Sequence, residues 1–307
     1  MRRVWAALAV LAVLLLALAA WLYAPDKPRA ELEARYAGPP STFVEVLGVR
    51  LHVRDTGPRD APALLLLHGF GASLHTWDAL AARLDGTRRV IRMDLPGFGL
   101  TGPDPTRDYS DAHSHAVLLA LMDRLGVARA DVAGHSMGGR IAWTLAAAHP
   151  ERVGRLVLMA PDGFASAGFD YGRAPKVPPL LRLLPYVMPT FLLRASLVPA
   201  YGDPAFVTDA MVARYRDMLL APGVRQAILD RTAGQVLRDP VPLLRGIRAP
   251  VLLLWGARDA MIPARNARDY LAALPNARLV EYPGVGHVLH EEAADRVAAD
   301  MQGFLAE

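Results

Sequence analysis

Residues 131–148 read DVAGHSMGGRIAWTLAAA, and the fold can be worked out from this stretch. Residues 131–134 form a short apolar run, which is typical of a strand buried on both faces. From Met137 to Ala148 the apolar residues follow a helical spacing. Between strand and helix stands a G-x-S-x-G pattern, in the context where such a turn lifts the serine hydroxyl above the sheet edge. The stretch therefore predicts a strand, a sharp turn with Ser136 as nucleophile, and a helix.

Short apolar runs and helical patterns alternate on both sides of this stretch. A hairpin is expected around Gly48, and further strands are expected at 63–67, 89–95, 156–160, 251–255 and 278–282. Helices are expected at 74–84, 109–125, 264–274 and 288–304. Strands that alternate with helices predict the α/β class, with a mostly parallel sheet covered by helices on both faces.

The alternation stops once, from about residue 164 to 248, where helical segments are interrupted by many prolines. We expect a helical insertion in the domain here and no separate domain. Its apolar segments Leu180–Leu184 and Phe191–Leu193 predict either a surface that dips into a membrane or the packed underside of the insertion.

The N-terminal segment differs from the rest of the chain. Residues 4–24 carry no charge and follow Arg2 and Arg3. About 20 apolar residues match a bilayer core, and the two arginines would stay on the cytoplasmic side. We expect residues 1–25 to be an uncleaved membrane anchor or, alternatively, a signal segment cleaved after small residues, which leads to secretion. Residues 26–42 are expected to be a linker, and residues 43–307 a domain exported to the periplasmic side of a bacterium.

Composition excludes several kinds of chemistry. The chain has no Cys, which excludes disulfides, thiolate nucleophiles and zinc–cysteine sites. Its 34 basic residues form no basic stripe, so no nucleic-acid partner is expected. A G-x-G-x-x-G match at 97–102 precedes Pro103, which prevents the helix that a dinucleotide site needs. No histidine pattern completes a metal set, and we expect neither a metal nor an organic cofactor.

Residues 43–307 resemble the α/β-hydrolase superfamily in three motifs that occur in the expected order. These are HGFG at 68–71 after the third strand, MDLPGFG at 93–99, and the succession of Ser136, Asp259 and His287. The resemblance implies an eight-stranded sheet, with the insertion as a cap over the active site. It also implies an oxyanion hole made by the backbone N–H groups of Phe70 and Met137.

The resemblance implies a Ser-Asp-His triad in which His287 takes the proton of Ser136 and Asp259 orients the imidazole. Asp162 follows the sixth strand, where some α/β-hydrolases carry their acid, and stays open as the alternative to Asp259. His290 lies near His287 and is expected to be an ordinary, partly buried side chain. His68 and His135 are expected to pack or to form hydrogen bonds, and Asp94 to cap its loop.

The function expected from these features is hydrolysis of carboxylic esters through an acyl-enzyme intermediate. A serine at the turn argues against relatives that use a carboxylate there, the haloalkane dehalogenases and epoxide hydrolases. Carbon–carbon bond hydrolases, acyltransferases, perhydrolases and a non-catalytic binding member of the fold remain alternatives. The apolar insertion favours a small, lipophilic ester as substrate.

Overall fold

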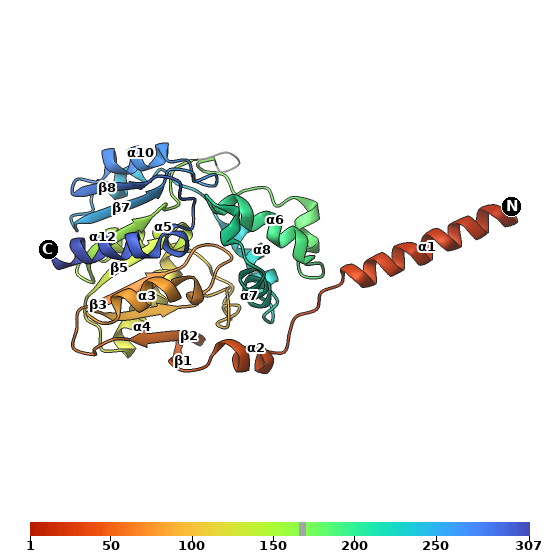
Figure 1. The fold of residues 1–307 in the computed structure, drawn as a ribbon, viewed down its shortest axis with the longest axis horizontal. Helices are drawn as coiled ribbons and strands as arrows, with labels where there is room; N and C mark the ends of the chain where they lie inside the picture. The colour runs from red at the N-terminus through yellow and green to blue at the C-terminus, as the bar shows by residue number, and fades with distance from the viewer. Residues whose placement is uncertain (166–169) are drawn as a thin grey trace.

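The computed structural model describes residues 1–165 and 170–307 and contains a single eight-stranded sheet (Figure 1). The strands lie in the order β1-β2-β4-β3-β5-β6-β7-β8. Only the pairs β1–β2 and β2–β4 are antiparallel. The eight strands are β1 (Ser41–Val46), β2 (Val49–Thr56), β3 (Ala63–Leu67), β4 (Arg89–Met93), β5 (Ala130–His135), β6 (Val153–Met159), β7 (Val251–Gly256) and β8 (Ala277–Tyr282). The predicted α/β class and mostly parallel sheet are confirmed.

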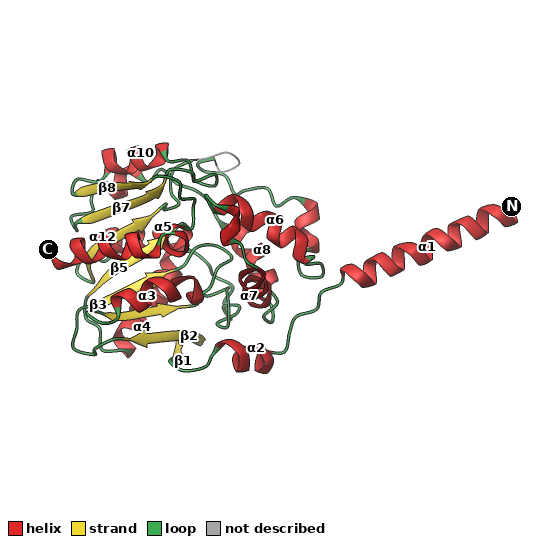
Figure 2. Ribbon diagram, in the orientation of Figure 1, coloured by secondary structure: helices red, strands yellow, loops and turns green. Residues whose placement is uncertain are grey.

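Helices cover both faces of this sheet (Figure 2). The helices α3 (Asp78–Leu84) and α12 (Ala294–Ala306) pack on one face, and α4 (Asp111–Arg124), α5 (Met137–Ala148) and α10 (Arg265–Ala273) on the other. An apolar core lies on each face of the sheet, and β3 contributes to both. Leu64 and Leu66 belong to the core under α3 and α12, and Leu65 and Leu67 belong to the core under α4, α5 and α10. Because successive side chains of a strand point to opposite faces, an unbroken run of leucines suits a strand between two layers.

The last predicted helix, 288–304, is two helices. Residues Leu289–Glu292 form α11, and α12 begins after Ala293, whose φ of −131° is not helical. The predicted helix 74–84 likewise begins with a 3₁₀ turn, η1 (Leu74–Trp77), before α3. Hydrophobic periodicity does not detect such breaks, because the apolar face continues across them.

The insertion between β6 and β7 is helical, as expected from the sequence. It contains η2 (Pro179–Leu183), α6 (Thr190–Leu197), η3 (Val198–Ala200), η4 (Pro204–Phe206), α7 (Asp209–Leu219), α8 (Val224–Gly234) and α9 (Val241–Leu244). Its predicted span of about 164–248 includes residues 166–169, which lie outside the described residues. A small apolar core within it includes Met188, Leu193 and Val212. Figure 1 places α6, α7 and α8 at one end of the sheet, and we call the helical segments of this insertion the cap.

Much of the apolar sequence of the cap is exposed. Leu180 is 75% exposed and Phe191 61%, and Leu181, Leu183, Tyr186 and Leu192 are exposed as well. We call these six residues the apolar face of the cap. They are therefore not the packed underside of the insertion, whereas Met188 and Leu193 are buried.

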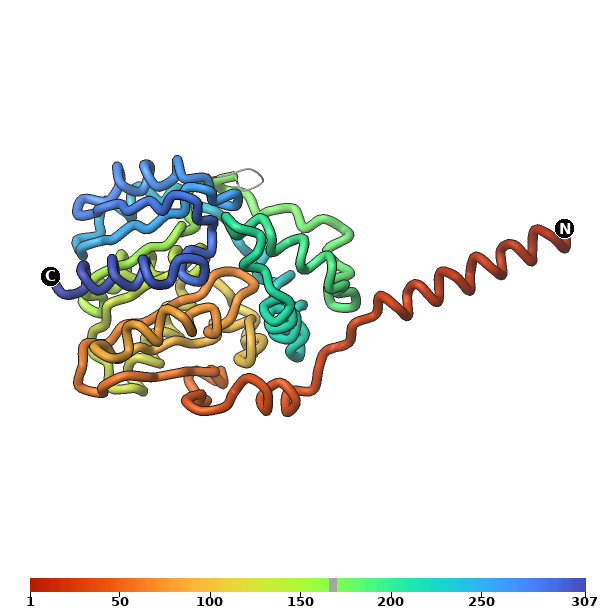
Figure 3. Tube along the Cα trace, viewed as in Figure 1, coloured from red at the N-terminus to blue at the C-terminus, as the bar shows by residue number. Residues whose placement is uncertain are grey.

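The N-terminal helix α1 (Arg2–Leu22) projects away from the rest of the molecule (Figure 3). None of its residues is buried, and it is long and apolar enough to cross a membrane, a test that an N-terminal signal sequence also passes. The segment 26–42, expected to be a linker, carries α2 (Arg29–Tyr36), whose Leu32 is buried in the larger core.

Candidate active site

Ser136 occupies a strained turn between β5 and α5. Its φ of 52° and ψ of −117° lie in a region that residues with a Cβ rarely adopt. A Cβ at Gly134 would lie 2.3 Å from the carbonyl oxygen of Gly138, and one at Gly138 would lie 2.2 Å from that of Leu67. Both glycines of the pattern are thus required by close backbone packing, which forces the serine out of the regular strand and helix.

The loop after β3 lies against this turn. A Cβ at Gly69 would lie 3.3 Å from the Cβ of Ser136. The next residue is Phe70, which is half exposed and packs edge-on against Phe98. In residues 1–165 and 170–307, neither the amide of Phe70 nor that of Met137 donates to a protein acceptor. The Met137 amide also begins α5, where the helix dipole favours negative charge.

His287 and Asp259 form a buried pair. The Nδ1–H group of His287 donates to Oδ2 of Asp259 over 2.7 Å. The other carboxylate oxygen accepts the amides of Met261 and Ile262, each over 2.8 Å. Because the carboxylate is held on both oxygens, it determines which imidazole nitrogen carries the proton and leaves Nε2 as the acceptor.

Asp162, the alternative acid, has other partners. Its carboxylate accepts a hydrogen bond from the side-chain amide of Gln235 over 3.0 Å. Burial raises the pKa of Asp162, so its environment favours the neutral acid more than water does. Of the two carboxylates, only Asp259 contacts His287 in the described part of the chain.

His135 joins the serine turn to the loop of His287. Its Nε2–H donates to the carbonyl oxygen of His287 over 3.0 Å, and the two ring centroids lie 4.5 Å apart. His290 lies on another side of His135 and is fully buried, more than the sequence predicted. Burial lowers the pKa of His290 to about 3, and burial and the neighbouring histidines lower the pKa of His135 well below its usual value. His135, the residue before Ser136, thus links the serine turn to the loop of His287.

The Ser136 hydroxyl donates no hydrogen bond to His287 within the described residues. Such contacts are often long in enzymes without substrate and tighten when substrate binds. The structure therefore shows the hydrogen bond of His287 to Asp259, and it joins His287 to His135, the residue before Ser136.

Glu292, which sequence reasoning missed, joins the His287 loop to the cap. Its carboxylate accepts the backbone N–H groups of Gly286 over 2.8 Å and of Gly202 and Asp203 over 3.0 Å each. The amide of His287 also donates to the carbonyl oxygen of Ala200 in the cap, over 2.7 Å. The sequence signal was a pair of glutamates, four and five residues after His287 and just before the last helix.

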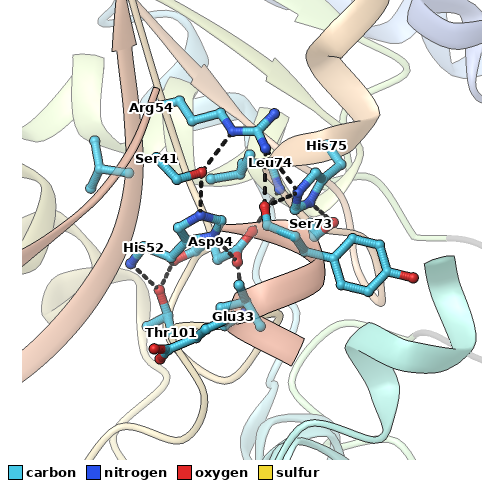
Figure 4. Close-up of polar contacts among 12 residues, drawn as sticks. Glu33, Ser41, His52, Arg54, Ser73, Leu74, His75, Asp94 and Thr101 are labelled. Atoms are coloured by element: carbon cyan, nitrogen blue, oxygen red, sulfur yellow. Dashed lines mark hydrogen bonds and ion pairs between the residues drawn. The ribbon is translucent and has the colours of Figure 1, made fainter. Parts of the chain in front are cut away.

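Asp94 organises the loops beside the site (Figure 4). It is buried and accepts the amides of Leu74 and Leu100, each over 2.7 Å, and Nδ1–H of His52 over 2.8 Å. Burial alone would raise the pKa of Asp94, but the charge and hydrogen bond of His52 outweigh it and lower that pKa. Asp94 does more than cap its own loop, since it ties the 94–102 loop to the segment that follows Phe70.

His52 also accepts a hydrogen bond from the Ser41 hydroxyl over 2.9 Å, so Ser41, His52 and Asp94 form a second Ser-His-Asp chain. The oxygen of this serine accepts a further bond from Nε–H of Arg54. The sequence gives no G-x-S-x-G pattern at Ser41, and no helix begins there. We therefore regard this chain as structural.

Comparison with known proteins points to one family. A family model described as "alpha/beta hydrolase fold" matches residues 62–294. A dihydrolipoyllysine-residue acetyltransferase component of an acetoin cleaving system from Pseudomonas putida is 34% identical over 270 residues, covering 87% of this chain and 70% of that protein. A 2-hydroxymuconate semialdehyde hydrolase from the same species is 31% identical, covering 85% of this chain and 92% of that protein. A solved structure of a membrane phospholipase A has 25% identity and a TM-score of 0.71, covering 100% of this chain and 98% of that one.

Proposed function

The chain belongs to the α/β-hydrolase family, and from this premise we propose that it is a membrane-anchored serine hydrolase that cleaves carboxylic esters. The observation that carries the proposal is the strained turn of Ser136 beside the buried His287–Asp259 pair. A strained serine close to a base that is held by an acid is the arrangement that nucleophilic catalysis requires.

Each group has a distinct role in this reaction. Nε2 of His287 takes the proton of Ser136 as its oxygen attacks the ester carbonyl carbon, and then gives that proton to the departing alcohol. Asp259 stabilises the imidazolium that forms. The amides of Phe70 and Met137 stabilise the oxyanion, an effect of about 3–4 kcal/mol for one donor. Water then attacks the acyl-enzyme by the same route and releases the acid.

The arrangement of α1 and the cap supports a lipophilic substrate. The amide of Ala24, just beyond α1, donates to the carbonyl oxygen of Tyr186 over 2.8 Å. The apolar face of the cap therefore begins where the helix ends, and a bilayer crossed by α1 would lie against it. Exposed apolar side chains are stabilised by burial in the interfacial region of a bilayer. The similarity to a membrane phospholipase A over the full chain also favours an ester substrate near a membrane.

A second candidate is cleavage of a carbon–carbon bond with the same three residues. The 2-hydroxymuconate semialdehyde hydrolase matches over most of both chains at higher identity than the phospholipase. That function does not account for α1 or for the apolar face of the cap, which is why the ester is preferred here.

Covalent labelling tests the nucleophile. A fluorophosphonate is expected to add to Ser136, because the reagent takes the place of the ester carbonyl in the attack. The Ser136→Ala variant is expected to lose both labelling and turnover. If peptide mass spectrometry finds another serine labelled in that variant, Ser136 is not the nucleophile. If the wild-type protein does not react with the reagent, a non-catalytic member of the fold is favoured.

A substrate series tests the bond that is cleaved. We expect kcat/KM for nitrophenyl esters to rise from acetyl to about hexanoyl or octanoyl, since each buried methylene contributes about 0.8 kcal/mol. A series that peaks at acetyl and collapses by butanoyl would contradict a lipophilic ester. Turnover of a 2-hydroxy-6-oxo-dienoate faster than any ester would establish the second candidate instead.

A further inference from the structure

A cavity of about 710 Å³ lies beside α5, the helix that follows Ser136. Its wall includes Tyr109, His115, Arg140, Trp143, Arg231 and Gln235. These residues come from α4 and the segment before it, from α5, and from the end of α8 with the segment that follows. Ser136 is not among the lining residues in the described part of the chain. The cavity is therefore a neighbour of the proposed active site and not the oxyanion pocket itself.

Arg231 is a buried cation in this wall. The residue is 3% exposed, and its Nε and Nη1 have no hydrogen-bond partner among the described residues. Its strongest polar contact there is a long one, 3.4 Å from Nη2 to the carbonyl oxygen of Pro96. The guanidinium otherwise faces the rings of Phe98 and Tyr109, at 5.4 Å and 5.2 Å from their centroids. A buried guanidinium with so few acceptors is costly unless something else compensates it.

Arg140 is a second cation near the first. It is 8% exposed, its Nε also lacks a partner within the described residues, and its Nη2 lies 3.0 Å from a carboxylate oxygen of Asp111. Burial is the main cause that lowers the pKa of Arg231 to about 10, and the charge of Arg140 lowers it further. In residues 1–165 and 170–307, Asp111 is the carboxylate within 4.0 Å of either guanidinium.

The other titratable groups around the cavity differ in burial. Burial lowers the pKa of His115, and burial raises the pKa of Asp162, which lies behind Gln235. The other charged residues have both signs and lie at more exposed positions, where water screens them: Arg107, Asp108, Asp230, Arg238 and Asp239. Among the charged residues that line the cavity, the two buried ones are therefore Arg140 and Arg231, and one partly buried carboxylate, Asp111, lies beside them.

We infer that this cavity binds a small organic anion, a carboxylate or a phosphate monoester with an apolar body, whose charged group is held by Arg231 and Arg140. Guanidinium groups bind carboxylate and phosphate oxygens in pairs of charge-assisted hydrogen bonds. The rings of Tyr109 and Trp143 offer an aromatic wall for the apolar body. The anion is either part of the ester substrate, in which case the inference rests on the proposed function, or a separate effector molecule.

Binding is tested on the full chain in detergent micelles with phenylacetate and phenyl phosphate, and with phenylacetamide as the uncharged control. Quenching of tryptophan fluorescence reports occupancy, because Trp143 lines the cavity. Phenylacetate is expected to bind at least about tenfold more tightly than phenylacetamide, and Arg231→Met to abolish that difference. Arg278→Met, which removes an exposed arginine paired with Glu307, is the matched control and is expected to keep the wild-type affinity.

Thermal unfolding provides a second readout. Without ligand, Arg231→Met is expected to melt no lower than wild type, because the variant removes a poorly compensated buried charge. Phenylacetate should raise Tm for wild type and not for the variant. Equal affinity for phenylacetate and phenylacetamide, or an unchanged phenylacetate affinity in folded Arg231→Met, would overturn the inference. If that variant does not fold, Arg140→Met takes its place under the same criteria.

Kinetics separate the two sources of the anion. If the anion is part of the substrate, phenylacetate should compete with nitrophenyl esters, and esters with a terminal carboxylate on the acyl chain should have a KM that rises in Arg231→Met. If it is an effector, phenylacetate should change kcat without competing. The binding and melting measurements do not need turnover, so their failure is distinguishable from failure of the proposed function.

Discussion

The carboxylates of Asp259 and Asp162 follow neighbouring strands of the sheet, yet their surroundings differ. Asp259 accepts two backbone amides and the imidazole N–H of His287. Asp162 accepts one side-chain amide, and burial raises its pKa. The acid that orients a histidine must stay ionised, and the surroundings of Asp259 stabilise an ionised carboxylate more than those of Asp162 do.

Asp259→Asn is therefore expected to lower kcat by about 10⁴, because the wrong imidazole tautomer would face Ser136. Asp162→Asn should change kcat far less. We also expect this variant to melt no lower than wild type at neutral pH. Because the folded-state pKa of Asp162 is raised, ionisation of its carboxyl group destabilises the fold as the pH rises through that pKa, whereas asparagine does not ionise. Steady-state kinetics and melting of the two variants check both statements, and equal losses of kcat would transfer the role to Asp162.

At the scale of elements, the cap and the loop that follows β8 pack closely and share hydrogen bonds. Glycines allow the two segments to meet: a Cβ at Gly202 would lie 2.2 Å from the carbonyl oxygen of Gly284, and one at Gly286 would lie 2.4 Å from the amide nitrogen of Gly202. Glu292 then bridges both segments through backbone amides. The position of His287 is thus set in part by the cap.

Glu292→Gln is expected to lower kcat by up to about 10², while KM for a short ester stays near the wild-type value. The glutamine amide nitrogen cannot accept the N–H groups that the carboxylate accepts, so the His287 loop loses support without a change in the substrate pocket. Glu281→Gln, an exposed acid on β8, is the control and should retain wild-type kinetics. A rise in KM at constant kcat would show that Glu292 shapes the pocket and does not position the histidine.

At the scale of the whole molecule, several histidines are buried. Burial lowers the pKa of His75 to about 4 and of His290 to about 3, and also lowers the pKa of His68, His115 and His135. In the unfolded chain these histidines take up protons near their ordinary pKa of about 6.5. The unfolded state then binds more protons than the folded state, so stability falls as pH drops below about 6.5.

We therefore expect Tm to fall steadily from pH 7 to pH 5. Each buried histidine is expected to lower the free energy of unfolding by up to about 1.4 kcal/mol per pH unit. His290→Gln should make this pH dependence less steep. Asp94, whose folded pKa is lowered, acts in the same direction only below about pH 4 and does not contribute in this window. A Tm that is constant between pH 7 and pH 5 would contradict the prediction.

The N-terminal helix gives a further prediction for the whole molecule. The full chain is expected in the membrane fraction, released by detergent and not by high salt, because α1 is apolar along its length. Intact-mass measurement of the purified protein should find residues 1–25 retained. A mature N-terminus just beyond the small residues of this segment would identify it as a cleaved signal.

Local features of the chain were predictable from its sequence. The helix Met137–Ala148 and the strand Ala63–Leu67 have the predicted bounds, and the order of the strands in the chain followed from alternating periodicities. These features depend on residues near each other in the chain, whose spacing and turn chemistry can be read directly. The same is true of Ser136, since the close-packed glycines that force its turn are its near neighbours.

Only the tertiary structure determined which distant side chains meet. The hydrogen bond of His287 to Asp259, the bridge from Glu292 to Gly202, and the cavity shared by Arg140 and Arg231 each join separate parts of the chain. The periodicity of the sequence indicates which face of a helix or strand is apolar. It does not indicate which polar groups on distant loops form hydrogen bonds with each other. That choice depends on how the sheet and the cap close around the site, because a buried donor or acceptor must find its partner there or lose the free energy of a hydrogen bond.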